Sequence, residues 1–218
     1  MTKQKQQYPE DFRTIFGVAT MSLSQVMNSA FIMGYLMLYI TDYLGLYAGV
    51  AGKAAQIAAV MLLLGRIWDA INDPLLGFVM DRSPRTRWGK FKPYMLIFTP
   101  LSTSLLILLF NIPIGLSDGV KVVLLFILYF LFDSAFTLLP ILPLTQSLSN
   151  DARIRAKLVA VPRIVSLFLM MSTSFFIPVA VLLGQDGVTP NIGLGVLVFA
   201  APIALLSTVG AALVKEGT

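Results

Sequence analysis

Two residue types are missing from this chain of 218 residues: it has no cysteine and no histidine. The absence of cysteine excludes a disulfide framework and a thiolate metal site. Without histidine, any proton or cation chemistry has to use carboxylates. Charged residues are also scarce, at 12% of the sequence, whereas soluble domains have about 25%. Because the sequence shows neither a nucleophile–base set nor a phosphate-binding loop, we expect no enzyme activity and no cofactor.

Hydrophobic residues, by contrast, make up 57% of the chain, and its mean hydropathy is +0.82. A membrane-spanning helix needs about 20 mostly apolar residues. Six such segments predict an all-α integral membrane protein with a single bundle over residues 1–218. The predicted spans are residues 14–40, 52–80, 93–113, 121–148, 158–184 and 191–214. The N-terminal segment MTKQKQQYPEDFR has no short apolar core, so no signal peptide is predicted.

Basic residues are distributed unevenly over the predicted loops. Of the 16 Lys and Arg residues, 12 lie on one side of the predicted membrane, and only Lys53 and Lys121 lie on the other. Because cytoplasmic loops carry an excess of Lys and Arg, both termini of this multi-pass protein are predicted to be cytoplasmic, in the cell membrane. The net charge of +5 does not indicate a nucleic-acid partner, since the charges lie in short loops beside apolar spans.

The second predicted span carries three charged side chains, Arg66, Asp69 and Asp73. Their spacing of i, i+3 and i+7 places them on one face of a helix. Counted from the cytoplasmic end, Asp73 would lie roughly 12 Å deep and Asp69 roughly 18 Å deep, where charges are costly and by default functional. Two carboxylates one turn apart repel each other, and a bound sodium ion or proton relieves that repulsion. The alternative is that Arg66 only neutralises Asp69 in a packed bundle.

Other polar side chains in the predicted spans allow more than one role. Arg163 in the fifth span is expected to face a central cavity or to pair with an acid on another helix. Asp133 in the fourth span could pair with Arg163 or Arg66, or lie near the mouth of a cavity. Gln25 and Asn28 in the first span either contact a substrate or bond a neighbouring helix, as uncharged polar residues in spans usually do.

Two adjacent motifs resemble a known family. RIWDAINDPLLGFVMDR, residues 66–82, and RTRWGKFKP, residues 85–93, resemble the second helix and following loop of the glycoside–pentoside–hexuronide:cation symporters. This family of the major facilitator superfamily includes melibiose permease. YLMLYITDYLGL, residues 35–46, and LVAVPR, residues 158–163, resemble the end of the family's first helix and the start of its fifth. The resemblance covers essentially the whole chain and implies cation-coupled symport of a sugar or glycoside across a lipid bilayer.

The resemblance also implies roles for particular residues of this chain. The implied cation site, for sodium or a proton, consists of Asp69, Asp73, Asn72 and Thr137, with Asp69 and Asp73 as the ligands of sodium. The candidates for a substrate cavity are Arg163, Gln25, Asn28 and Arg66. The candidates for a gating network on the cytoplasmic side are Asp81, Arg82, Arg85, Arg87, Lys90 and Lys92. This basic loop alternatively only sets the topology and contacts anionic lipid headgroups.

The chain departs from the family pattern in two respects. Family members have two six-helix bundles, whereas this chain stops at ALVKEGT, so we expect an N-terminal half that needs a second bundle. An ungapped alignment also places Val26, Pro140 and Leu144 where galactoside-binding members carry two acids and an aromatic residue, which predicts a different substrate or none. Two alternatives are a half-transporter that works as a homo- or heterodimer, and a non-transporting fragment or binding subunit.

Overall fold

Helices make up most of the described chain. The computed structural model describes residues 12–148, 151–185 and 188–214, and no β-strand occurs among them. The elements in chain order are α1 (Phe12–Leu38), the π-helical turn η1 (Tyr39–Tyr43), α2 (Lys53–Arg82), α3 (Lys92–Leu109), α4 (Asp118–Thr137), α5 (Ile141–Ser147), α6 (Ala152–Ser172), the 3-10 turn η2 (Thr173–Phe175), α7 (Phe176–Leu182) and α8 (Ile192–Leu213).

Six helical segments are long and apolar enough to cross a membrane, so the predicted all-α architecture is confirmed. These segments are Arg13–Tyr43, Lys53–Arg82, Lys92–Leu109, Asp118–Ser147, Ala152–Leu182 and Ile192–Leu213. The third segment ends four residues before its predicted end at 113, because Pro113 restricts Ile112 to non-helical backbone conformations. The fifth begins at Ala152 rather than 158, because the Asp151 side chain caps the helix by accepting a hydrogen bond from Arg153 N, at 2.8 Å.

Two of the predicted spans are interrupted helices rather than continuous ones. The fourth breaks between Thr137, where α4 ends, and Ile141, where α5 begins. Pro140 lies in this break and has no backbone N–H to continue the helix. The fifth passes through the 3-10 turn η2 before α7. Such breaks are tolerated at membrane depth where protein or a cavity satisfies the freed backbone groups.

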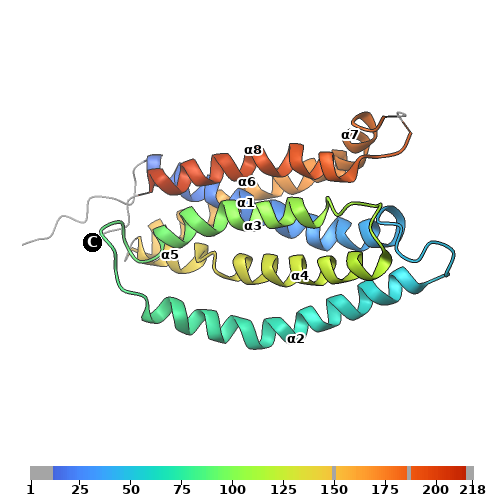
Figure 1. The fold of residues 1–218 in the computed structure, drawn as a ribbon. Coiled ribbons are helices and arrows are strands. Elements are labelled where there is room, and N and C mark those ends of the chain that lie inside the picture. Colours follow the sequence, from blue (N-terminus) through green and yellow to red (C-terminus); the bar gives the residue numbers. More distant parts are fainter. Residues whose placement is uncertain (1–11, 149–150, 186–187, 215–218) are drawn as a thin grey trace, which may run out of the picture.

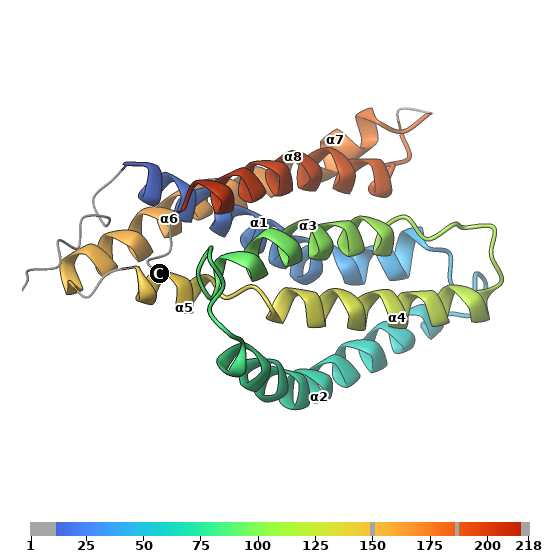
Figure 2. The same ribbon diagram turned by 60° about the vertical axis from the view of Figure 1, so that its left-hand side comes forward.

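The helices pack around α1, which contacts α8, α6 and α3. Figure 1 shows that the ends of α1 and α8 leading to the two termini lie at the same end of the bundle as the α2–α3 loop. Helix α3 packs against α4 and α8. Helix α2 packs mainly against α4 and curves along the edge of the bundle, as Figure 2 shows from a second direction. Pro74 lies inside this curved helix.

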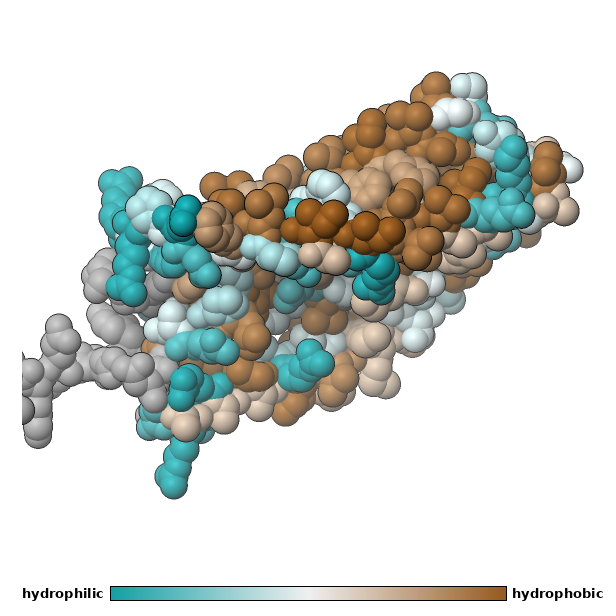
Figure 3. All heavy atoms as spheres, turned by 90° about the horizontal axis from the view of Figure 1, so that it is seen from below, coloured by the Kyte–Doolittle hydropathy of each residue, from teal (hydrophilic) through white to brown (hydrophobic). Residues whose placement is uncertain are grey.

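Aromatic rings fill the core between α1 and its neighbours. Phe31 of α1 contacts Phe176 and Phe110 edge-to-face, with ring centroids 4.9 Å and 6.2 Å apart. The outer surface is apolar as well: large exposed side chains such as Leu63 of α2 and Phe168 of α6 project from the bundle. Figure 3 shows hydrophobic residues over the middle of one face of the molecule and hydrophilic residues mainly at its two ends. This distribution fits a bilayer around the middle of the bundle.

Lys121, the first residue of the fourth predicted span, is held between α4 and the η1 region. The structure includes it in the first turn of α4, and only 4% of its surface is exposed. Its Nζ donates a hydrogen bond to Leu44 O at 3.2 Å and lies 3.8 Å from Asp118 Oδ1. Lys121 therefore joins α4 to the η1 region at the end of the bundle opposite the α2–α3 loop. Three basic residues that the predicted topology places in the cytoplasm lie outside the described part of the chain: Lys3, Lys5 and Lys215.

Candidate functional site

Carboxylates from two helices line a hollow of about 450 Å³ between α1, α2 and α4. We call this space the carboxylate hollow. Its charged and hydroxyl-bearing residues on α2 and α4 are Arg66, Asp69, Asp73, Tyr129, Asp133 and Thr137. Thr137 Oγ1 donates a hydrogen bond to Asp73 Oδ1 at 3.1 Å and so joins the end of α4 to the middle of α2. Three carboxylates against one guanidinium leave the hollow with an excess of negative charge.

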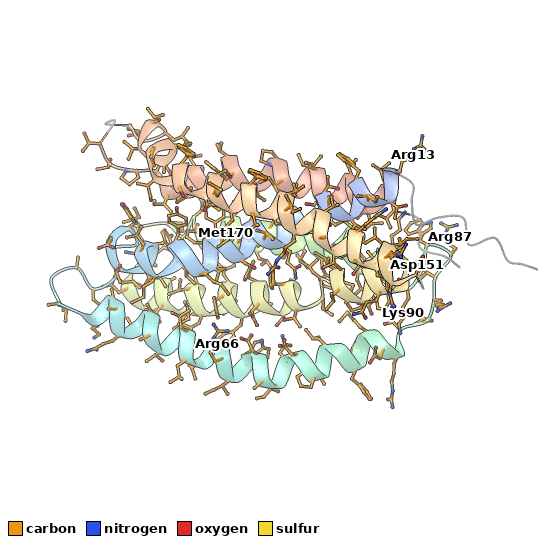
Figure 4. The ribbon with its side chains drawn as sticks, turned by 180° about the vertical axis from the view of Figure 1, so that it is seen from behind. Arg13, Arg66, Arg87, Lys90, Asp151 and Met170 are labelled. Carbon is orange, nitrogen blue, oxygen red and sulfur yellow. The ribbon has the colours of Figure 1, made fainter. Side chains whose placement is uncertain are left out.

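The helical spacing of Arg66 and Asp69 brings the two side chains together. Arg66 Nη1 lies 3.6 Å from Asp69 Oδ2, and Figure 4 shows Arg66 on the side of α2 that faces α4. The Arg66 side chain is 78% exposed and that of Asp69 29%. An exposed pair at this distance contributes little to stability. Arg66 therefore partly neutralises Asp69 and leaves Asp73 and Asp133 without an ion pair among the described residues.

Asp133 belongs to the carboxylate hollow, a position that the sequence left open. It lines this hollow together with Asp69, Asp73 and Arg66. Asp133 Oδ2 is buried and has no hydrogen-bond partner in the structure described. The structure thus places Asp133 near Arg66, whereas the predicted alternative partner Arg163 lines another hollow. The spacing of Asp133 and Thr137, one turn apart on a helix, could have indicated this shared face.

Asn72 lies beside the carboxylate hollow rather than among the residues that line it. Its side chain is buried, with 4% of the residue exposed, and Nδ2 has no hydrogen-bond partner in the described structure. The other three predicted cation-site residues, Asp69, Asp73 and Thr137, do line the hollow together. Within residues 12–148, 151–185 and 188–214, no group of three Asp, Glu, His or Cys side chains is arranged to hold a metal ion.

A second and larger hollow, of about 890 Å³, lies between α1 and α6. We call it the α1–α6 hollow. Gln25 and Ser29 of α1 line it together with Arg163 and Ser166 of α6, and the remaining lining is mostly apolar. Met170 is one of these apolar residues, and Figure 4 shows it on α6 where that helix crosses α1. Arg163 forms no ion pair within the described part of the chain, so a positive charge faces this space uncompensated.

Two of the predicted substrate-cavity residues, Asn28 and Arg66, do not line the α1–α6 hollow. Asn28 is only 1% exposed, and its Nδ2 donates hydrogen bonds to Ser102 Oγ and Thr103 Oγ1 of α3, both at 3.3 Å. It therefore bonds a neighbouring helix, the alternative that the sequence left open, although it lies only one turn from Gln25 on α1. Arg66 lines the carboxylate hollow and is absent from the lining of the α1–α6 hollow.

Two lysines of the predicted gating network hold the α2–α3 loop in place by bonding backbone carbonyls. Lys90 Nζ donates a hydrogen bond to Asp81 O at 2.9 Å, and Lys92 Nζ donates to Ala212 O and Val214 O at the end of α8, both at 2.7 Å. The Asp81 carboxylate forms no ion pair within the described residues. The loop therefore ties α2 and α3 to α8 through backbone carbonyls.

The arginines of this loop contact aromatic rings or extend away from the bundle. The Arg82 guanidinium lies 3.9 Å from the centroid of the Phe78 ring, and that of Arg87 lies 5.2 Å from the centroid of Trp88. Arg85 is exposed. Exposed basic and aromatic side chains at one end of an apolar bundle are typical of the boundary between a membrane and water.

The sequence of this apolar bundle matches a family of transport proteins. Residues 16–218 match the family described as MFS/sugar transport protein. The chain belongs to this family. Its predicted membership of the glycoside–pentoside–hexuronide:cation symporters, within the major facilitator superfamily, is confirmed by this match and by similar proteins. The chain is thus a multi-pass membrane protein of a transport family, not of an enzyme family.

Three similar proteins show the range of this family. The glucuronide carrier protein homolog of Escherichia coli (strain K12) is 36% identical over 169 residues, which cover 76% of this chain and 35% of that protein. The lactose permease of Lactobacillus helveticus is 36% identical over 134 residues, 58% of this chain and 21% of that protein. The sodium-dependent lysophosphatidylcholine symporter 1-B of Danio rerio is 34% identical over 100 residues, 45% of this chain and 19% of that protein. The chain spans about a third or less of the length of these relatives.

Proposed function

We propose that this six-helix bundle is the cation-binding half of a symporter that couples a sodium or proton gradient to the uptake of a sugar or glycoside. The single observation that supports this most strongly is the hydrogen bond of Thr137 to Asp73 inside a hollow that Asp69 and Asp133 also line. Carboxylates at membrane depth are costly unless a cation or a partner compensates them. One guanidinium cannot compensate three carboxylates, so a bound cation supplies the missing positive charge.

Sodium is the first candidate for the coupling ion. Hard cations bind oxygen ligands, and Asp69, Asp73 and Thr137 offer carboxylate and hydroxyl oxygens. One relative is named as a sodium-dependent symporter. A proton is the alternative, because it also relieves the repulsion between neighbouring carboxylates.

The substrate would occupy the α1–α6 hollow, where Arg163, Gln25 and Ser166 offer polar groups to hydroxyls. Two relatives are named for a glucuronide and for lactose, which supports a sugar or glycoside as the class of substrate. In this proposal a second six-helix bundle closes the hollow from the other side, and the two bundles rock against each other. Both termini face the cytoplasm, since the basic α2–α3 loop lies at the same end as the described ends of the chain.

The first test is cation binding by the purified chain. A ligand that binds only the folded state at a hundred times its Kd stabilises that state by about 2.7 kcal/mol. We therefore expect sodium, or a proton supplied by lower pH, to raise the midpoint of thermal unfolding at constant ionic strength. Asp73→Asn should abolish this shift, whereas the matched control Asp42→Asn, at an exposed residue of the η1 turn, should retain it. An equal shift in both variants would show that Asp73 does not bind the cation.

The second test is transport. The chain is reconstituted in liposomes alone and together with a second six-helix bundle, and uptake of a labelled glucuronide is measured with and without a sodium or proton gradient. Gradient-driven uptake is expected only with the second bundle, and only with Asp73 intact. Uptake by the chain alone would favour self-association, and no uptake in any combination would favour a binding subunit.

A further inference from the structure

The two hollows share one wall. Ser29 and Met33 of α1 and Phe136 of α4 line both the carboxylate hollow and the α1–α6 hollow. The carboxylates lie on one side of these three residues and Arg163 lies on the other. Any movement of this wall therefore changes the shape of both spaces at once.

Phe136 is the member of the wall that is joined most directly to the carboxylates. It precedes Thr137, the last residue of α4, whose hydroxyl bonds Asp73. The chain then leaves the helix at Leu138 and passes Pro140 before α5 begins. The last turn of a helix lacks some of its backbone hydrogen bonds, so it can shift at lower cost than the middle of a helix. A cation that draws Asp73 and Thr137 together would therefore also reposition the Phe136 ring.

The surroundings of Phe136 allow such a movement. The ring is half-buried and stacks on Phe132, with centroids 5.6 Å apart and an interplanar angle of 26°. It packs against both hydrophobic clusters of the bundle, and so lies where the two clusters meet. Met33, on the α1 side of the wall, is 79% exposed. Its unbranched, polarizable side chain adapts readily to the shape of a neighbour.

We propose that Phe136, with Met33 of α1 completing the wall, is the positioning residue that couples the carboxylate hollow to the α1–α6 hollow. A cation held by Asp73 and Thr137 sets the position of the Phe136 ring, and the ring sets the shape of the space into which Arg163 projects. By thermodynamic linkage, occupancy of the α1–α6 hollow favours the cation to the same extent that the cation favours its occupancy. This inference rests on the proposed cation-coupled function.

The absence of cysteine makes a direct measurement possible, because one introduced thiol reports on one place. Gly34 lines the α1–α6 hollow, and a Cβ built on it meets no atom within 4 Å, so Gly34→Cys adds a thiol there without a clash. Gly115, in the loop between α3 and α4, also has no atom within 4 Å of a built Cβ, and Gly115→Cys is the matched control. Alkylation rates of the purified full chain are compared in sodium chloride and in choline chloride, and thermal unfolding is recorded in parallel.

In the parent background, sodium is expected to change the alkylation rate of Gly34→Cys by about fivefold or more, the lower end of typical coupling between sites. The rate at Gly115→Cys should not change. Phe136→Ala and the bulkier Phe136→Leu should abolish the effect of sodium on Gly34→Cys while sodium still raises the unfolding midpoint. Met33→Ala changes an exposed side chain, so it decides the question if neither Phe136 variant purifies as folded protein.

Two other results would separate a failure of the coupling role of Phe136 from a failure of the proposed function. In the first, sodium stabilises every variant, but it does not change the alkylation rate of Gly34→Cys in the parent background, or it still changes that rate in the Phe136 variants. The coupling role of Phe136 is then wrong, and the proposed function stands. If neither sodium nor lower pH stabilises even the parent chain, the proposed function fails, and the inference fails with it.

Discussion

At the scale of single residues, polar side chains within the spans take two different roles. Asp73 and Thr137 bond each other across a hollow that contains two more carboxylates, so their arrangement favours a ligand. Asn28 is instead enclosed by hydroxyl groups of α3, which satisfy its amide without any ligand. The difference is in what surrounds each group, since all three residues are polar and lie within helices.

Thr137→Val should weaken cation binding without abolishing it. The substitution keeps the shape of the side chain but removes the hydroxyl that holds Asp73 Oδ1. A hydrogen bond of this kind contributes about 1 kcal/mol, so the sodium concentration that gives half of the maximal thermal stabilisation should rise by about fivefold to tenfold. Thr137→Ser keeps the hydroxyl and should behave like the parent. Equal half-saturation in all three proteins would mean that this bond plays no part in cation binding.

Asn28→Ala should destabilise the bundle and leave cation binding unchanged. The variant loses the bonds to Ser102 and Thr103 and leaves their hydroxyls buried, which costs about 1–3 kcal/mol. Thermal unfolding in detergent should therefore begin at a lower temperature, with the same half-saturating sodium concentration. The matched control is Ser104→Ala, because Ser104 is exposed and bonds only Pro100 O of its own helix. A cation affinity that falls with Asn28→Ala would place this residue in the site after all.

At the scale of elements, close contact between α1 and α8 depends on two glycines. A Cβ built on Gly17 would lie 2.8 Å from Gly210 O, and one built on Gly210 would clash with Thr20. Small residues at such positions let two helix backbones approach closely in a membrane, where packing drives association. Because α1 contacts both α8 and α6, this approach also fixes one wall of the α1–α6 hollow.

Gly17→Ala and Gly210→Ala should each separate α1 from α8. Overpacking of this kind costs about 1–3 kcal/mol, so both variants should unfold at a lower temperature than the parent. Gly77→Ala is the matched control, since Gly77 also lies in a helix but a Cβ there meets no atom within 4 Å. A Gly77 variant destabilised as strongly as the other two would show that helix packing is not the cause.

At the scale of the whole molecule, one end of the bundle is basic and the surface between the ends is mostly apolar. The ends of α1 and α8 that lead to the termini lie at the basic end, beside the α2–α3 loop (Figure 1). The opposite end carries the η1–α2 and α3–α4 connections. By the positive-inside rule, the orientation that we propose has this basic end in the cytoplasm.

Single cysteines at the two ends should report this orientation. In intact cells, an impermeant maleimide should label Gly115→Cys and should label Arg87→Cys only after the cells are permeabilised. Both positions are exposed, and the parent chain has no cysteine to interfere. Labelling of Arg87→Cys in intact cells, and of Gly115→Cys only after permeabilisation, would show that the topology is the opposite of the predicted one. Lys121 is unsuitable as a reporter because it is buried.

Galactosides should bind poorly even when a second bundle is supplied. Val26 lines the α1–α6 hollow, while Pro140 and Leu144 are buried, so none of the three offers an acid or an aromatic ring to a sugar. Each missing hydrogen-bonding group typically costs about 1–3 kcal/mol. Equilibrium binding of labelled melibiose, with and without sodium, measures this directly. Tight, sodium-dependent binding by the isolated chain would contradict the prediction and indicate that self-association completes the site.

Much of the architecture could be predicted because a continuous run of apolar residues marks each membrane-spanning helix. Six apolar runs and an uneven distribution of Lys and Arg indicated the six spans, and the helical spacing placed Arg66, Asp69 and Asp73 on one face. The family motifs added Thr137, which the structure does bring to Asp73. These features depend on neighbours in sequence, so no tertiary contact was needed to infer them.

Only the tertiary structure decided which polar groups meet. Gln25 and Asn28 lie three residues apart on α1, yet one lines the α1–α6 hollow and the other bonds α3, because the rotation of α1 about its axis is set by packing against α3, α6 and α8. Helix packing also explains why Asp133 lines the same hollow as Asp69, whereas Arg163 lines the α1–α6 hollow. The break after Thr137 is a local effect of proline, but its position beside both hollows is a consequence of how α4 packs. The sequence determined which residues enter the membrane, and interhelical packing determined which of them face one another.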